Sequence, residues 1–132
     1  MLRVEPEIVN RYVAAGQVQL GFWHMLDHRH SALAHQAAEC AGQQSPLAFW
    51  RMHDTLFARL GELWNLENAT LIAFARELGL DAAVFESCLT DPSVTDKVAR
   101  MDQERRSAGI RLRPSFDVNG QIIQCAVPYD SF

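Results

Sequence analysis

The sequence predicts an α/β domain in which a block of helices separates one early strand from a late β-hairpin. Polar and apolar residues alternate through Gln17–Met25, which favours a strand. Several segments with helical apolar spacing follow, and an Asn119-Gly120 pair then stands between two β-favouring runs. Helices placed between one strand and a distant antiparallel pair are typical of an insertion in an α/β framework.

The first element is predicted to be an amphipathic helix over Pro6–Ala15. Its apolar residues recur at helical spacing, and Gly16 follows as a C-terminal stop signal. A strand over Gln17–Met25 comes next, with large apolar residues on both of its faces. We therefore expect this strand to lie inside a sheet that is covered on both sides.

Five further helices are predicted from capping and stop signals. Their expected bounds, in order, are Ser31 to Gly42, Ser45-Pro46 to Leu60, Asn65 or Asn68 to Gly79, Asp81 to Cys88, and Asp91-Pro92 to Gly109.

The hairpin within Arg113–Ile123 is the most specific local pattern. Pro114 cannot donate to a strand ladder, so it belongs at the start of a strand or in the loop before it. Phe116 and Val118 share one face, and Asn119-Gly120 suits a type I′ turn. After the second strand, Val127–Phe132 is predicted to begin a last helix.

The composition limits the possible classes of protein. With 132 residues and 48% hydrophobic residues, the chain is expected to form one domain over residues 1–132, with a helical insertion at about residues 31–108. The net charge of −4 leaves no basic surface of the kind that nucleic acid requires. Apolar runs are too short for a membrane span or a signal peptide. We expect no nucleic-acid partner, no membrane partner and no cofactor.

The three cysteines, Cys40, Cys88 and Cys125, include no C-x-x-C pair. Cys40 and Cys88 are interpreted as buried free thiols, with a bridge between them as the alternative, which would indicate an oxidising compartment. Cys125 is expected on the second hairpin strand as an apolar sheet residue, with a redox role as the alternative.

Five segments, taken together and in this order, resemble the DsbA-like thiol–disulfide oxidoreductases: Val4–Leu20, Ala38–Ala41, Phe49–Phe57, Glu77–Asp81 and Arg113–Gly120. The resemblance covers nearly the whole chain and implies a thioredoxin-like fold with an inserted helical subdomain. It also implies that Pro114 is the cis-proline whose loop accepts an extended protein or peptide substrate. Arg113 stands where members of that family often carry Thr or Val, beside the substrate backbone.

The chain departs from this family at its beginning. Family members carry a first core strand and then C-x-x-C at the N-terminus of the first helix, where the helix dipole favours the reactive thiolate. Neither is found here, so no catalytic residue is predicted, and the chain is interpreted as N-terminally truncated relative to the family and inactive as a dithiol oxidase. One alternative is a non-catalytic peptide-binding or assembly module that uses the Pro114 groove and an open sheet edge. Another is a glutathione-dependent relative of the same fold.

Loss of a central strand would expose two rows of unpaired backbone groups. We therefore expect either that Gln17–Met25 pairs directly with Ser115–Val118 in a three-stranded antiparallel sheet, or that a homodimer fills the gap. The family resemblance suggests an extracytoplasmic location, whereas the sequence shows no signal peptide, so the compartment stays open.

The histidines raise the question of a metal site, because His24, His28, His30 and His35 lie close together in the sequence. No carboxylate or thiolate stands at the spacing of a known site type, so we predict no metal and interpret these residues as solvated loop histidines. His53 lies in the apolar stripe of its helix and is interpreted as a hydrogen-bonded core or interface histidine, with a catalytic base as the alternative.

Overall fold

The computed structural model describes residues 4–27, 31–125 and 129 of the 132-residue chain. The chain divides into two compact units, which are considered separately: residues 24–103, called the helical unit, and residues 1–23 with 104–132, called the hairpin unit.

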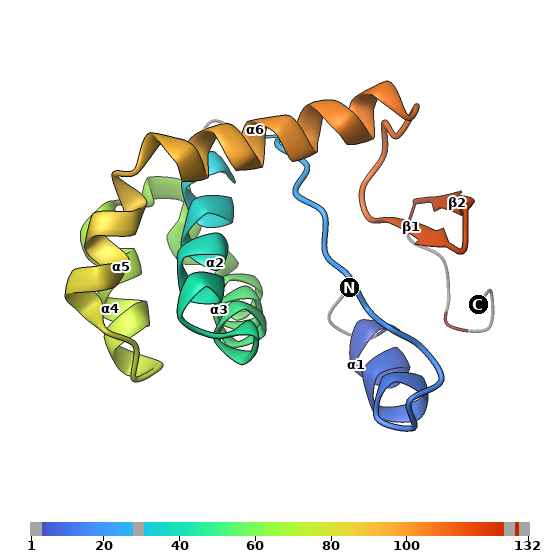
Figure 1. Cartoon of the computed structure of the whole chain (residues 1–132), viewed down its shortest axis with the longest axis horizontal. Coiled ribbons are helices and arrows are strands. Elements are labelled where there is room, and N and C mark those ends of the chain that lie inside the picture. The colour runs from blue at the N-terminus through green and yellow to red at the C-terminus, as the bar shows by residue number, and fades with distance from the viewer. Residues whose placement is uncertain (1–3, 28–30, 126–128, 130–132) are drawn as a thin grey trace. The chain divides into compact units, whose positions relative to one another are not determined.

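The helical unit consists of packed helices, with α2 and α3 side by side and α4 and α5 next to them (Figure 1). Their bounds are α2 Ser31–Gln44, α3 Pro46–Ala58, the 3₁₀ helix η2 Leu60–Asn65, α4 Asn68–Glu77, α5 Ala82–Leu89 and α6 Pro92–Ser107, whose last residues belong to the hairpin unit.

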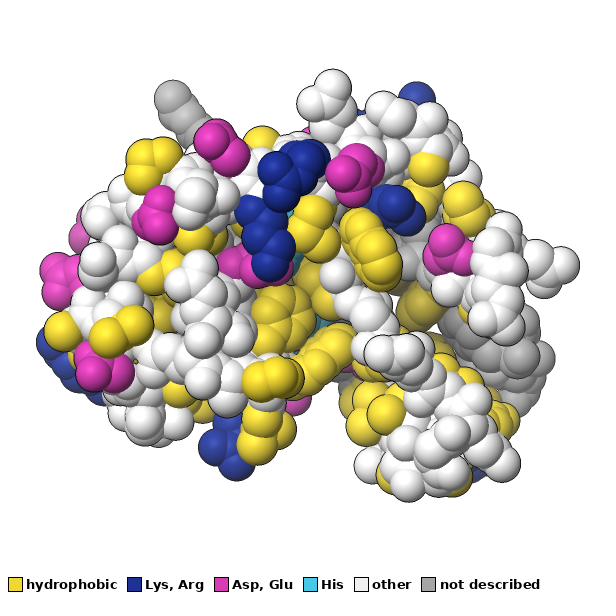
Figure 2. Space-filling model, viewed as in Figure 1, with side chains coloured by type: hydrophobic (Ala, Val, Ile, Leu, Met, Phe, Trp, Pro, Cys, Tyr) yellow, Lys and Arg dark blue, Asp and Glu magenta, His cyan; other side chains and the backbone are white. Residues whose placement is uncertain are grey.

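Small residues allow α2 and α3 to pack closely. Ala37 and Ala41 on α2 are fully buried, and a Cβ added at Gly42 would come within 3.3 Å of the Phe49 side chain on α3. Larger side chains complete the core; the largest fully buried ones include Met52, Leu71, Phe74 and Phe85. On the outside, acidic and basic side chains lie next to one another over α6 (Figure 2).

The predicted helix starts are confirmed where a side chain caps the helix. Ser45 Oγ accepts a hydrogen bond of 3.1 Å from Ala48 N, and Pro46 is the first residue of α3. Asp81 Oδ1 accepts bonds of 3.0 Å from the first backbone amides of α5. Two helix ends differ, because α2 continues to Gln44 and α3 ends at Ala58. The 3₁₀ helix η2, which was not predicted, lies between α3 and α4.

The first predicted helix is correct in place and wrong in form. It begins as α1, Val4–Ile8, and widens into a π-helix, η1, over Val9–Val13. The widening shows in the i→i−5 bond of 2.9 Å from Ala14 N to Val9 O. Bonds of 2.9 Å from Gly16 N to Val13 O and from Gln17 N to Tyr12 O then close the helix end in a Schellman motif. Gly16, at φ +70°, is the left-handed residue of this motif.

The predicted strand at Gln17–Met25 is wrong, because this segment has no regular secondary structure. In the described part of the chain the sheet has two strands, β1 Ser115–Val118 and β2 Gln121–Gln124, so the expected three-stranded sheet is also wrong there. Alternation favours a strand only when a neighbouring strand pairs with it. Trp23 instead lies half-exposed with its ring 4.9 Å from the Arg105 guanidinium carbon. The described domain is therefore mostly helical with one small sheet.

The hairpin prediction is confirmed. β1 and β2 are antiparallel, and Val118 pairs with Gln121 across the two-residue turn. Asn119 and Gly120 have φ values of +53° and +91°, as a type I′ turn requires. Asp117 Oδ1 accepts a hydrogen bond of 2.7 Å from Gly120 N inside the turn. The helix expected over Val127–Phe132 lies outside the described residues, except for Tyr129.

Candidate functional site

The candidate binding site is the loop that leads into β1, together with the outer edge of that strand. The Arg113–Pro114 peptide bond is cis, and β1 begins at the next residue, Ser115. Gln124 Oε1 on β2 accepts hydrogen bonds of 3.0 Å from Arg111 N and 3.3 Å from Leu112 N. The Gln124 side chain therefore holds the loop that carries Arg113 and Pro114.

A second contact braces the other side of the same loop. Ser115 Oγ donates a hydrogen bond of 2.6 Å to Leu112 O. Neither Ser115 nor Gln124 was singled out from the sequence, because their partners lie across a loop and follow no periodic pattern. The only available signal was that each hairpin strand has a polar residue at the end away from the turn, Ser115 on β1 and Gln124 on β2.

The register fixes which backbone groups of β1 face away from β2. In a two-residue hairpin the pair beside the turn, here Val118 and Gln121, exchanges backbone hydrogen bonds, and alternate pairs along the ladder repeat this. Phe116 with Ile123 is then the second bonded pair, whereas Ser115 and Asp117 direct their backbone N–H and C=O groups outward. Among the described residues no strand pairs with this outer edge of β1, so its backbone groups have the geometry to pair with one more extended chain.

Replacing Gln124 by leucine is expected to loosen this loop. The change removes the acceptor of two backbone amides, and a typical hydrogen bond contributes about 1 kcal/mol. Hydrogen exchange of the Arg111 and Leu112 amides should accelerate roughly fivefold to tenfold. Gln121→Leu on the same strand is the matched control, and equal exchange rates in the two variants would show that Gln124 does not brace the loop.

The end of α6 adds positive charge to the hairpin unit. Arg111 Nη1 donates to Ile110 O at 3.1 Å and also to Arg106 O in the last turn of α6. Cations are favoured at a helix C-terminus, because the last carbonyl groups carry partial negative charge. Arg113 is exposed two residues further along.

Cys40 on α2 and Cys88 on α5 form a disulfide, with Cα atoms 5.7 Å apart. The interpretation as free thiols is therefore wrong, and the alternative pairing is correct. Local sequence could not decide this, because 48 positions separate the two residues and only the packing of α2 against α5 brings them together. Both residues are buried, at 1% and 7% exposure.

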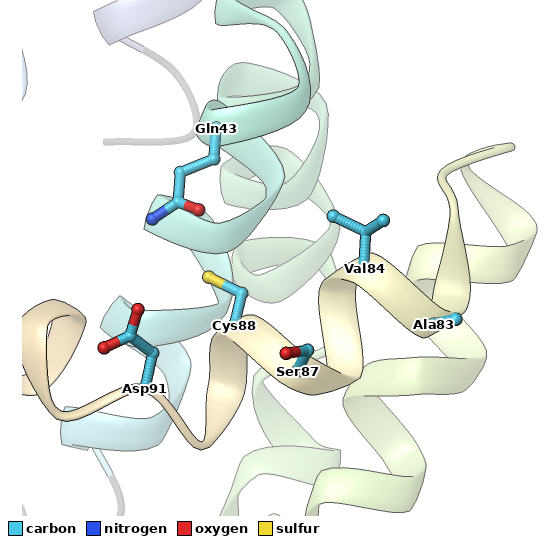
Figure 3. A pocket seen from close by; sticks show the side chains of 6 residues that line it. All are labelled: Gln43, Ala83, Val84, Ser87, Cys88 and Asp91. Carbon is cyan, nitrogen blue, oxygen red and sulfur yellow. The ribbon is translucent and has the colours of Figure 1, made fainter.

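An open depression of about 410 Å³ lies beside the disulfide (Figure 3). Its lining residues are Gln43, Ala83, Val84, Ser87, Cys88 and Asp91. The Cys88 sulfur points towards α2, where it is bonded to Cys40, so Cys88 offers no free thiol to this space.

Cys125 is exposed and follows β2, outside the ladder, at φ +81°. The expectation of an apolar sheet residue is therefore wrong. A left-handed backbone at this position is incompatible with continuing the strand.

A hydrogen-bonded cluster around the buried His24 joins the beginning of the helical unit to α2. His24, fully buried, lies with Nδ1 2.8 Å from His35 Nδ1 and Nε2 2.7 Å from Glu39 Oε1. Lys97 on α6 forms an ion pair with the other oxygen of Glu39. The interpretation as solvated loop histidines is wrong for His24 and His35.

The surroundings of His35 and Glu39 lower the pKa values of both side chains. Burial, followed by the proximity of His24, lowers the pKa of His35 from 6.5 to about 4. The hydrogen bond from His24, and then that from Lys97, outweighs burial and lowers the pKa of Glu39 to about 2. Glu39 is therefore ionised at neutral pH, and His35 is neutral.

The other histidines fall into two groups. His28 and His30 lie outside the described residues, so the structure does not test whether they could bind a metal together with His35. His53 is buried, as predicted, with its ring centroid 4.7 Å from that of Phe57 and its Nδ1 3.1 Å from Asp54 Oδ1.

A mostly helical unit, a small hairpin and a proline loop that leads into it define a thioredoxin-like domain. The family model described as "Thioredoxin" matches residues 2–132, and the chain belongs to this family. No solved structure gives a significant match.

Two curated relatives match part of the chain. One is named Na(+)/H(+) antiporter NhaA 1, from Salinispora arenicola, and is 36% identical over 71% of this chain and 14% of its own length. The other, Na(+)/H(+) antiporter NhaA from Herminiimonas arsenicoxydans, is 35% identical over 74% of this chain and 15% of its own length. The chain thus spans about one seventh of each relative. In the part of the chain that the structure describes, no helix has the length and apolar character needed to span a membrane.

Proposed function

We propose that this chain is a DsbA-like member of the thioredoxin family that binds an extended polypeptide along the outer edge of β1, beside Arg113 and Pro114. We propose also that residues 1–132 alone do not catalyse dithiol oxidation. The observation that carries the proposal is the outward backbone of Ser115 and Asp117 directly after the braced proline loop. Backbone pairing with an open edge is a general way to bind peptides with little regard to their sequence.

The cysteines support the second part of the proposal. Thiol–disulfide exchange needs an accessible thiolate and a resolving thiol. In this chain Cys40 and Cys88 are joined and buried, and Cys125 is far from both in sequence, with no C-x-x-C elsewhere in residues 1–132. A disulfide that ties two helices is most simply structural, and it favours an oxidising compartment.

The antiporter relatives add one point. Segments similar to this chain occupy about one seventh of proteins named as Na(+)/H(+) antiporters, so a polypeptide-binding domain of this kind would belong to larger proteins in those cases. Antiport itself is named for those proteins as wholes, and we do not assign it to this domain.

Peptide binding is expected to appear as local protection of β1. The protein is titrated with an unstructured peptide rich in Thr and Val, and amide exchange is followed residue by residue. Protection should rise at Ser115 and Asp117, whose amides face outward, and should change little at Phe116 and Val118, which already pair with β2. The double variant Ser115→Pro, Asp117→Pro removes both outward donors and should abolish binding.

The control variant for this experiment is Ile122→Pro, because Ile122 faces outward on β2, the opposite edge of the hairpin. It should leave the affinity nearly unchanged. A peptide that protects β2 rather than β1, or that fails to bind, would contradict the proposed site. In a separate assay, insulin reduction by dithiothreitol should run at the background rate with the 132-residue chain, and clear acceleration would refute the proposed lack of dithiol chemistry.

A further inference from the structure

Basic residues are concentrated in the segment that precedes β1. Residues 104–113 hold four arginines (Arg105, Arg106, Arg111 and Arg113) and one acidic residue (Glu104), which gives a local charge of 4 − 1 = +3. The whole chain has a net charge of −4. The segment next to the proposed peptide-binding edge is therefore positively charged, although the chain as a whole is negatively charged.

The roles of these arginines differ. Arg105 stacks over Trp23, and Arg111 closes the end of α6 through carbonyl groups. Neither contact neutralises the guanidinium charge, because an aromatic ring and a carbonyl oxygen carry no net charge. Arg113 is exposed and lies two residues before Ser115, which is at most about 7 Å of extended chain. It is the cation nearest in sequence to the outward backbone of β1.

The other end of the same strand carries the opposite charge. Asp117 is exposed, and its carboxylate accepts a hydrogen bond from the Gly120 amide. The edge therefore begins beside Arg113 and ends beside Asp117. A chain laid along it meets positive charge at the proline loop and negative charge near the turn.

We infer that the polypeptide bound along β1 carries a Glu or Asp side chain beside Arg113 at the proline loop. This inference depends on the proposed function and names the substrate class of the same site. Charge complementarity selects an acidic residue at this position, because like charges across an interface are disfavoured and opposite charges raise both selectivity and the rate of association. A polypeptide is favoured over nucleic acid, because the strand edge offers alternating donors and acceptors to another peptide backbone.

The test compares three peptides of one Thr- and Val-rich sequence, with Glu, Gln or Lys at a single position near one end. At low salt the Glu peptide should bind roughly fivefold more tightly than the Gln peptide, and the Lys peptide should be the weakest. At about 0.5 M salt the difference should fall below twofold, because exposed charges are screened. Arg113→Gln should remove the preference, and Arg113→Lys should retain most of it.

The matched control is Arg51→Gln. Arg51 is an exposed arginine on α3 of the helical unit, so this variant changes the net charge equally and should keep the preference for Glu. Equal affinity for all three peptides overturns the acidic preference while leaving peptide binding in place. If none of the three binds, the proposed function fails as well. Displacement of the Glu peptide by a single-stranded oligonucleotide at equal concentration also overturns the inference, because it indicates a general anion site.

Discussion

The double variant Cys40→Ala, Cys88→Ala is expected to lose about 4 kcal/mol of unfolding free energy relative to the native protein. A disulfide restricts the unfolded chain, and a closed loop of the 48-residue separation found here corresponds to about 4 kcal/mol in the chain-entropy treatment. The two residues lie in a core cluster that also contains Phe74 and Phe85, so the bridge ties α2 to α5 where they are already packed. The loss should appear as a lower midpoint in urea unfolding.

Cys125→Ser is the matched control for the disulfide. Cys125 is exposed and free, so its replacement should change the unfolding free energy by no more than about 0.5 kcal/mol. Native protein that is incubated with dithiothreitol should shift towards the double variant, since reduction removes the same constraint. A difference below about 1 kcal/mol between the native protein and the double variant would mean that α2 and α5 hold together without the bridge.

The parts of the fold that the sequence predicted well depend on neighbouring residues. Ser45-Pro46 and Asp81 start helices through bonds to amides two or three positions away, and Asn119-Gly120 makes a turn through its own backbone angles. Such signals act within a few residues, so a short segment of sequence is enough to predict the helix start or the turn.

The parts that were predicted wrongly depend on distant residues. Gln17–Met25 has the alternation of a strand, and no described strand pairs with it. The Cys40–Cys88 bridge and the His24–His35 contact join residues 48 and 11 positions apart, respectively. One local signal for the histidine cluster did exist, because His35 and Glu39 stand one helical turn apart on α2. At the candidate site, the hairpin and Pro114 were identified from sequence, whereas the bracing role of Gln124 required coordinates.

Acidification is expected to destabilise the helical unit well before ordinary carboxylates are protonated. The pKa of His35 is about 4 in the folded protein and 6.5 in the unfolded chain, so the folded state binds fewer protons between these values. The contribution of His35 is complete above pH 6.5 and is lost as the pH falls towards 4. The shift corresponds to about 3 kcal/mol, because each pKa unit is worth about 1.4 kcal/mol and His35 is largely buried.

Glu39 acts in the same direction over a lower range. Its pKa is about 2 in the folded protein against 4.5 ordinarily, so its contribution is present above pH 4.5 and is lost between 4.5 and 2. The two groups therefore predict a fall in the unfolding free energy that begins near pH 6.5, through His35, and continues below pH 4.5, through Glu39. Urea unfolding at a series of pH values measures both steps.

Two variants separate the two steps. His35→Asn keeps a polar side chain that can face His24 Nδ1 but does not titrate, so the loss between pH 6.5 and 4 should shrink to that of the remaining groups. Glu39→Gln should keep the upper step and remove the lower one, because an amide can accept the bond from His24 Nε2 without carrying charge. If the unfolding free energy of the native protein is constant from pH 7 to pH 4.5, His35 is not held neutral by burial. The contacts among His24, His35 and Glu39 would then not determine the acid stability.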